Sequence, residues 1–205
     1  ISHLDNTFIE CDEVYEITDK KLKKIKWFNR MKINKKKGIL FWITGLSGSG
    51  KTSLGKKIFV EINKKYGKTI LLNGDDLRNI FQLKKYSFSD RYQLAMSYSN
   101  FCKKITDQKI NLIFTTVSMF HNVRHYNNKN INNYIEIFIK TNIKKIIKED
   151  KKKLYKSKYK KNIVGMDIKF EIPKKPLITL NNNFTESLDS LSEKLLKKIF
   201  QKIKN

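Results

Sequence analysis

One glycine-rich motif, placed directly after a short apolar run, limits this chain to few folds. The apolar run covers residues 39–43, and the sequence GLSGSGKT at 45–52 follows it, ahead of a helical pattern of lysines and apolar residues. A strand, a glycine-rich turn and a helix in this order are the setting of a phosphate-binding loop. Glycines allow its backbone N–H groups to curl around a polyphosphate, because they adopt positive φ without steric cost. A chance match of a glycine-rich turn is the alternative, and the complete setting argues against it.

The motif gives separate roles to its polar side chains. Lys51 is placed to reach the β- and γ-phosphates, and the hydroxyl of Thr52 is placed to bind Mg²⁺. The N-terminus of the following helix adds partial positive charge. We therefore expect ATP and Mg²⁺ to bind at this loop. The expected ATP-binding residues are Gly45, Ser47, Gly48, Ser49, Gly50, Lys51, Thr52 and Ser53.

Short apolar runs alternate with helical patterns from residue 38 to the end of the chain. The runs predict strands at residues 39–43, 69–73, 110–116, 134–139 and 177–180. The intervening patterns predict helices at 53–66, from a cap at Ser89 or Asp90 to about residue 108, at 142–149 and at 185–203. This alternation is typical of a parallel sheet with right-handed crossovers. We expect an α/β chain with the three-layer P-loop NTPase fold and a mostly parallel five-stranded sheet, which binds ligands at the carboxyl ends of its strands.

Residues 1–37 differ from the rest of the chain. They combine an acidic cluster at 10–13 with basic runs at 20–26 and 32–37, and their apolar residues show no clear period. We interpret them as a linker or the end of a preceding domain, and residues 38–205 as one kinase-like domain. The chain begins at Ile1 rather than Met, which suggests a fragment or a fusion to an N-terminal domain.

Composition narrows the range of partners. The formal net charge is +25, from 44 Lys and Arg against 19 Asp and Glu, which raises the question of a nucleic-acid partner. The lysines are spread along the whole chain without a basic stripe interleaved with aromatics, so we expect no nucleic-acid binding. Cys11 and Cys102 fit no metal or redox spacing, and no apolar run approaches the roughly 20 residues that cross a bilayer. We expect a cytoplasmic protein without a membrane segment.

Asp75 is the second anchor of the predicted site. It follows the strand at 69–73 closely, so it projects over the edge of the sheet near the phosphate loop. A carboxylate there would accept the proton of an attacking hydroxyl or hold Mg²⁺ through water. Arg78 is placed to meet an anionic acceptor. The alternative is that Asp75 and Asp76 merely cap the next helix; we favour a function for Asp75 and leave Asp76 open.

Five segments of the chain together resemble the adenylylsulfate kinase family. They are GLSGSGKT at 45–52, LLNGDDLR at 71–78, FSDR at 88–91, KKLYK at 152–156 and GMDIKFEIPKKP at 165–176. The matching family segments are the phosphate loop, LDGDN-x-R, GFS-x-x-DR, a KGLYKKAR lid and GID-x-x-YE-x-P. Many kinases share the phosphate loop, whereas GDDLR and the pair LYK and DIKFEIP make the match specific. The resemblance extends over residues 38–180, most of the chain.

The resemblance implies an activity and a set of roles. The family transfers the γ-phosphoryl group of ATP to the 3′-hydroxyl of adenylylsulfate, a small nucleotide. Lys51 and Asp75 are then catalytic, Thr52 holds Mg²⁺, and residues 153–161 belong to a mobile lid. Such a cationic site suffices because phosphoryl transfer depends mainly on positioning and charge neutralisation. A homodimer is a further hypothesis. The implied acceptor-binding residues are Asp75, Arg78, Ser118 and Phe170.

Several acceptor-side positions depart from the family pattern. The EN-x-RR segment, whose Asn and Arg grip the acceptor in the family, becomes QLAMS at 93–97. The acceptor loop, which is SFISPYR in the family, reads TTVSMFH at 115–121 here. His121 replaces its arginine, and we leave open whether Arg124 substitutes for it. Losing an anion clamp costs about 1.5–3 kcal/mol per charged hydrogen bond, enough to change the preferred acceptor.

These departures leave three hypotheses about function. The first is a kinase of adenylylsulfate. The second is a kinase of another nucleotide conjugate, such as cytidine diphosphoramidate, which relatives of the family phosphorylate in bacterial capsule synthesis. The third is a non-catalytic nucleotide-binding module, and the intact Lys51, Thr52 and Asp75 argue against it.

Overall fold

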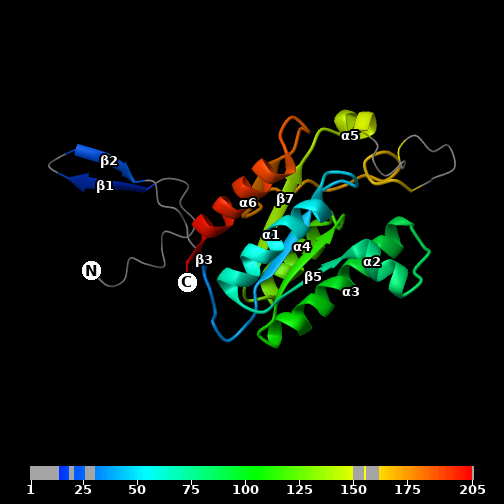
Figure 1. Cartoon of the computed structure of the whole chain (residues 1–205), viewed down its shortest axis with the longest axis horizontal. Coiled ribbons are helices and arrows are strands. Elements are labelled where there is room, and N and C mark those ends of the chain that lie inside the picture. The colour runs from blue at the N-terminus through cyan, green and yellow to red at the C-terminus, as the bar shows by residue number, and fades with distance from the viewer. Residues whose placement is uncertain (1–13, 19–20, 26–30, 150–154, 156–161, 205) are drawn as a thin grey trace.

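A five-stranded parallel sheet forms the centre of the chain (Figure 1). The computed structural model describes residues 14–18, 21–25, 31–149, 155 and 162–204. Within the sheet the strand order is β5–β6–β4–β7–β8, and every neighbouring pair is parallel. This confirms the predicted sheet and the three-layer α/β fold. Its strands are β4 (Leu40–Thr44), β5 (Thr69–Asn73), β6 (Asn111–Thr116), β7 (Tyr134–Lys140) and β8 (Ile178–Asn181).

The apolar run of the central strand β4 is continuous because helices cover both faces of the sheet. It lies between β6 and β7, with Leu40 opposite Leu112 of β6, and all five of its residues are buried. Side chains alternate between the two faces of a sheet, so a strand covered on both faces needs apolar residues at every position. Phe41 and Ile43 belong to one core cluster, and Leu40 and Trp42 belong to the other.

Helices cover both faces of the sheet and produce the three layers. Apolar residues of α1 and α6 pack in the first cluster, and those of α2, α3 and α4 pack in the second. Within the described part of the chain, no helix is long and apolar enough to cross a membrane. The helices are α1 (Lys51–Tyr66), α2 (Gly74–Ile80), α3 (Phe88–Asp107), α4 (His121–Asn130), α5 (Ile143–Glu149) and α6 (Leu188–Lys202).

The two helices α3 and α4 differ from the sequence-based prediction. The cap of α3 is Ser87, so the prediction of Ser89 or Asp90 was wrong. Ser87 and Asp90 instead form a reciprocal capping box, in which each side chain accepts from the backbone N–H of the other at 3.2 Å. The sequence predicts no helix at α4, because HNVRHYNNKN is almost entirely polar and buries only a narrow face.

Residues upstream of the sheet form two small strand pairings. β1 and β2 pair antiparallel with each other, whereas β3 pairs in parallel with β9 at the other end of the chain. Asn133 Nδ2 donates to the Asn34 carbonyl at 3.0 Å, so residues just after β3 lie against the sheet domain. The division between residues 37 and 38 stays a prediction. The four strands are β1 (Val14–Thr18), β2 (Lys21–Ile25), β3 (Met31–Lys32) and β9 (Ile203–Lys204).

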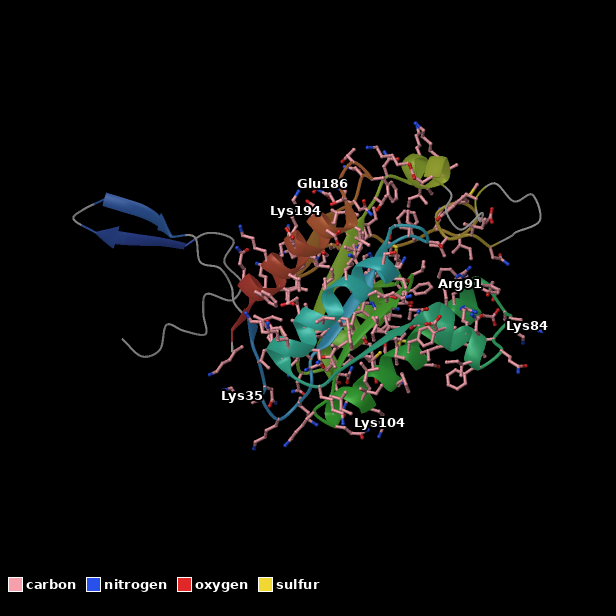
Figure 2. The ribbon with its side chains drawn as sticks, in the orientation of Figure 1. Lys35, Lys84, Arg91, Lys104, Glu186 and Lys194 are labelled. Atoms are coloured by element: carbon pink, nitrogen blue, oxygen red, sulfur yellow. The ribbon has the colours of Figure 1, made fainter. Side chains whose placement is uncertain are left out.

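The positive charge is distributed over the surface. Lys35, Lys84 and Lys104 are exposed and extend from well-separated parts of the molecule (Figure 2). Cys102 is buried in α3, and burial raises the pKa of its thiol, so it is a poor nucleophile at neutral pH. Cys11 lies outside the described residues.

Candidate active site

The phosphate loop connects β4 to α1 at the carboxyl edge of the sheet. Gly45, Gly48 and Gly50 have φ angles of 151°, 79° and 93°, a region that L side chains rarely adopt. A Cβ on Gly45 would lie 2.6 Å from the backbone oxygen of Ile139, so no side chain fits there. The glycines of the motif are therefore required by the shape of the loop.

Hydrogen bonds across the loop fix its shape and leave one hydroxyl without a partner in the described part of the chain. Lys51 Nζ, on a buried side chain, donates to the Leu46 carbonyl at 2.7 Å. Asn182, which follows β8, donates from Nδ2 to the Ser49 carbonyl at 3.0 Å. The Ser49 hydroxyl is buried and has no hydrogen-bond partner among the described residues. A buried hydroxyl beside the backbone N–H groups of a helix N-terminus fits a phosphate oxygen.

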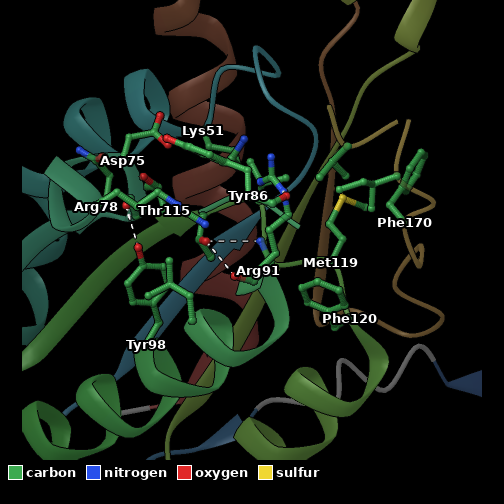
Figure 3. A pocket seen from close by; sticks show the side chains of 18 of the residues that line it. Lys51, Asp75, Arg78, Tyr86, Arg91, Tyr98, Thr115, Met119, Phe120 and Phe170 are labelled. Carbon is green, nitrogen blue, oxygen red and sulfur yellow. Dashed lines mark hydrogen bonds between the residues drawn. The ribbon is translucent and has the colours of Figure 1, made fainter. Parts of the chain in front are cut away.

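A cavity opens beside the phosphate loop, where strands β5 and β6 end (Figure 3). Lys51 lines it from α1, and Asp75 and Arg78 line it from α2. Met119 and Phe170 lie on the opposite side of the view. The cavity brings together six residues that the sequence pointed to, namely Lys51, Thr52, Asp75, Arg78, Ser118 and Phe170.

The two aspartates after β5 have different positions. Asp75 lines the cavity. Asn73 caps α2 and bonds to Asp76: the Asp76 backbone N–H donates to Asn73 Oδ1 at 2.8 Å, and the Asp76 carboxylate accepts from Asn73 Nδ2. Tyr98 supports the turn from α3 by donating its hydroxyl to the Gly74 carbonyl at 2.8 Å. Burial raises the pKa of Tyr98 to about 12, so this hydroxyl remains a donor throughout the physiological range.

Oxygen atoms suited to a hard cation line the cavity at the end of the phosphate loop. Thr52 Oγ1 lies 3.5 Å from Thr115 Oγ1, and Asp75 lines the same cavity. Mg²⁺ in kinase sites is bound by one or two protein oxygens together with phosphates, so these residues fit it. No group of three or more His, Cys, Asp or Glu that could bind a metal alone occurs among the residues that the structure describes.

Two arginines and a tyrosine form a cationic wall of the cavity. The guanidinium carbons of Arg78 and Arg91 lie 4.4 Å and 5.2 Å from the centre of the Tyr86 ring. Arg91 also donates from Nε to the Tyr86 carbonyl at 3.0 Å and from Nη2 to the Asn162 carbonyl at 2.7 Å. Burial, together with the charge of Arg78, lowers the pKa of Arg91 from its ordinary value. This wall can bind an anionic, planar group through charge and stacking.

The opposite wall, called the acceptor-side wall below, is lined mainly by Leu94, Ser118, Met119, Phe120 and Phe170, and Lys169 next to Phe170 also lines the cavity. Ser118 is buried, and its hydroxyl lies 2.9 Å from Thr116 Oγ1. Phe120 packs edge-on against Tyr92 of α3, with ring centres 5.6 Å apart. Leu94 lines the cavity at the position where the family pattern has the asparagine that grips the acceptor.

Arg124 does not take the place of the missing acceptor-loop arginine. It is buried outside the lining of this cavity, and its Nε lies 3.5 Å from Glu136 Oε1 of β7. His121 also lies outside that lining. Tyr155, from the predicted lid, donates its hydroxyl to the Ser47 carbonyl of the phosphate loop at 2.9 Å. The other residues of the predicted lid at 153–161 lie outside the described part of the chain.

Sequence reasoning missed three residues that the structure places at the site: Tyr86, Arg91 and Asn182. Arg91 ends the FSDR segment that carries the resemblance, so its place in that segment was a usable signal. Asn182 sits within the asparagine run after the fifth strand, at the carboxyl edge where ligands bind, which was a weaker one. Tyr86 has no signal in the local pattern, since its position depends on the two arginines that flank its ring.

Comparison with known proteins places this site in a family. The family model described as adenylylsulphate kinase matches residues 37–181. The chain belongs to this family. This adenylylsulphate kinase family member is 36% identical over 163 residues to a cytidine diphosphoramidate kinase of Campylobacter jejuni, covering 78% of this chain and 95% of the relative.

Two further family members support the assignment. The chain is 32% identical over 186 residues to an adenylyl-sulfate kinase of Clostridium acetobutylicum, which covers 88% of this chain and 90% of that protein. The solved structure of the Mycobacterium tuberculosis APS kinase CysC in complex with AMPPNP and APS superposes with a TM-score of 0.70 and 25% identity. That match covers 80% of this chain and 98% of the other. The chain is therefore a kinase, a phosphotransferase of the P-loop class.

Proposed function

We propose that this chain transfers the γ-phosphoryl group of ATP to a ribose hydroxyl of a small nucleotide conjugate. One observation carries the proposal: Lys51 and Thr52 of the phosphate loop line the same cavity as Asp75, Arg78 and the acceptor-side wall. A donor on the loop and an acceptor against that wall would meet inside one cavity. Catalysis of phosphoryl transfer is mostly positioning and charge stabilisation, which this arrangement supplies.

The loop geometry supports ATP as the donor. The Ser49 hydroxyl and the first N–H groups of α1 offer hydrogen bonds to phosphate oxygens. Thr52 would hold Mg²⁺, which neutralises the charge that develops on the phosphates. Lys51 would exchange its bond to the Leu46 carbonyl for a bond to the phosphates. The residues proposed to hold ATP are Gly45, Ser47, Gly48, Ser49, Gly50, Lys51, Thr52 and Ser53.

Asp75 is the proposed general base. It accepts the proton of the attacking ribose hydroxyl while the bond from that oxygen to the γ-phosphorus forms and the bond to the ADP oxygen breaks. Arg78 binds the anionic part of the acceptor, with Ser118 and Phe170 forming the facing wall. The Tyr98 hydroxyl holds the turn that carries Asp75 in place.

The acceptor-side wall favours a conjugate other than adenylylsulfate. A sulfate offers only acceptor oxygens, so it needs cationic or N–H donors around it. The part of the wall formed by Leu94, Ser118 and Phe120 carries no cation, and the cations among the described residues that line the cavity elsewhere are Lys51, Arg78, Arg91 and Lys169. A phosphoramidate carries N–H donors as well and can bond to a hydroxyl oxygen such as that of Ser118. We therefore place cytidine diphosphoramidate first among acceptors and adenylylsulfate second.

An acceptor panel tests the proposal. ADP release from MgATP is measured with cytidine diphosphoramidate, adenylylsulfate, CMP and AMP, each over a range of concentrations. We expect at least one of the two conjugates to be turned over with a kcat/KM about tenfold or more above both plain nucleotides. If none of the four accelerates ADP release, the kinase reaction proposed here is wrong. If adenylylsulfate is preferred over cytidine diphosphoramidate, only the order of acceptors is wrong.

Leu94→Asn tests the acceptor-side argument within the same panel. The variant restores the family asparagine at a residue that lines the cavity, so we expect adenylylsulfate to gain relative to cytidine diphosphoramidate. Gln93→Ala is the matched control, because Gln93 is exposed on the same helix and lies outside that lining. An equal change in both acceptors, or the same change in the control, would count against the argument. Sedimentation velocity of the full chain addresses the separate hypothesis of a homodimer.

A further inference from the structure

Arg124 is a buried cation that the proposed reaction does not use. It lies in α4 with only 6% of its surface exposed and outside the lining of the active-site cavity. Its Nη2 donates to the Glu171 carbonyl at 2.9 Å and lies 2.5 Å from His121 Nδ1. On its other side, Nε lies 3.5 Å from Glu136 Oε1 in β7. One side chain thus joins a strand, a helix and the segment that contains Glu171.

Two more hydrogen bonds join Glu171 to the acceptor loop. The Glu171 backbone N–H donates to the Met119 carbonyl at 3.0 Å. The Glu171 carboxylate accepts from the backbone N–H of His121. Met119, whose carbonyl accepts one of these bonds, and Phe170, which precedes Glu171 in the chain, both line the active-site cavity. The bonds around Glu171 therefore fix two parts of the acceptor-side wall against each other.

The energetics of the cluster point to positioning rather than to stability. Arg124 Nη1 and Glu136 Oε1 are buried without hydrogen-bond partners among the described residues. Burial raises the pKa of Glu136 to about 7, and the charge of Arg124 only partly opposes this. A buried ion pair is in general weak support for stability, because desolvation of both charges offsets their attraction. An incompletely bonded pair of this kind is better explained by the geometry it imposes on Glu171.

We propose that Arg124 is a positioning residue that sets the acceptor-side wall, by holding Glu171 and therefore Phe170 against the acceptor loop. This inference rests on the proposed function, since it assigns the wall to the acceptor rather than to ATP. Arg124 touches neither substrate. It acts on acceptor affinity through the backbone bonds of Glu171.

Two variants and a control test this role. Arg124→Met keeps the aliphatic length of the side chain and removes all its hydrogen bonds. Arg124→Lys keeps the positive charge opposite Glu136 but lacks the guanidinium Nη2 that reaches the Glu171 carbonyl. Lys103→Met is the control, because it removes an ion pair of 2.5 Å with Asp107 on α3, away from Glu171. Each protein is assayed for the KM of the acceptor, the KM of ATP and kcat, with the best acceptor of the panel.

We expect Arg124→Met and Arg124→Lys to raise the KM of the acceptor about tenfold and to leave the KM of ATP within about twofold. Lys103→Met should change neither. A purely structural role would instead lower activity through the amount of folded enzyme and leave both KM values unchanged. Equal effects on the two KM values, or full rescue by Arg124→Lys, would overturn the proposal.

Hydrogen exchange provides a readout that does not need turnover. The Glu171 amide donates to the Met119 carbonyl, and the His121 amide donates to the Glu171 carboxylate. We therefore expect both amides to exchange about tenfold faster in Arg124→Met than in Lys103→Met or the wild type. If no acceptor is turned over but these amides lose protection, the proposed function fails and the positioning stands. Unchanged exchange at both amides refutes the positioning, whatever the activity.

Discussion

Replacing Asp75 with asparagine separates a catalytic carboxylate from a helix cap. The substitution keeps the shape of the side chain and removes its capacity to accept a proton. General acid–base catalysis by a placed side chain contributes about 10²- to 10⁴-fold, or about 3–5 kcal/mol at 1.36 kcal/mol per decade of rate. We therefore expect kcat of Asp75→Asn to fall by at least about 100-fold with the best acceptor.

Asp76→Asn is the matched control, because the two residues are adjacent, acidic and exposed in the same helix turn. Asp76 bonds to Asn73 and does not line the cavity. Its replacement removes the charge of a first-turn carboxylate and leaves the backbone N–H that Asn73 caps in place, so we expect a loss of about 0.3–1 kcal/mol in the free energy of unfolding and a change in kcat below about threefold. The stability effect of Asp75→Asn should be no larger, since a first-turn carboxylate contributes about 0.3–1 kcal/mol through the helix dipole.

The assay is the initial rate of ADP release at saturating ATP and acceptor, with urea denaturation of each variant run in parallel. The two measurements distinguish a lost base from an unfolded enzyme. Turnover of Asp75→Asn within about threefold of wild type would refute the assignment of Asp75 as base. An equal loss of kcat in Asp75→Asn and Asp76→Asn would assign the effect to the helix start instead.

Three further variants test the loop, the turn and the buried pair. Gly50→Ala places a Cβ in left-handed backbone at 2.9 Å from Asn182 Nδ2, so urea denaturation should show a loss of about 2 kcal/mol and ATP should bind more weakly. Tyr98→Phe removes the bond to the Gly74 carbonyl, with an expected loss of about 1 kcal/mol and a lower kcat at unchanged KM for ATP. Glu136→Gln removes a carboxyl whose folded-state pKa is raised to about 7, so the folded protein holds this proton more tightly than the unfolded chain. Wild type should therefore lose up to about 3 kcal/mol relative to Glu136→Gln as the pH rises from 4.5 to 7, and a constant difference in the free energy of unfolding would contradict this.

The central architecture could be predicted from the sequence because its signals are local. Strands such as β4 are apolar at every position, which is what burial on both faces requires, and the phosphate loop has a fixed spacing of glycines. Polar elements gave no such signal. α4 buries a valine, an arginine and an asparagine, and the pairing of β3 with β9 joins two-residue segments from opposite ends of the chain.

The same distinction applies to the candidate site. Lys51, Thr52 and Asp75 could be predicted because each directly follows a strand of the sheet or belongs to a motif of fixed spacing. The contact of Asn182 with the phosphate loop could not, since it joins residues 133 positions apart in the chain. Arg124 shows the limit most clearly: its sequence position leaves open whether it replaces the missing acceptor-loop arginine, and the structure turns it towards Glu136 and Glu171.

The most direct test of the account follows the transferred group itself. ATP labelled at the γ-phosphorus is incubated with the enzyme, Mg²⁺ and the best acceptor of the panel, and the products are separated. The account predicts that the label appears in the acceptor nucleotide, in equal amount to the ADP formed, and that Asp75→Asn slows its appearance by at least about 100-fold. Label released only as inorganic phosphate, or retained in ATP with every acceptor, would contradict it.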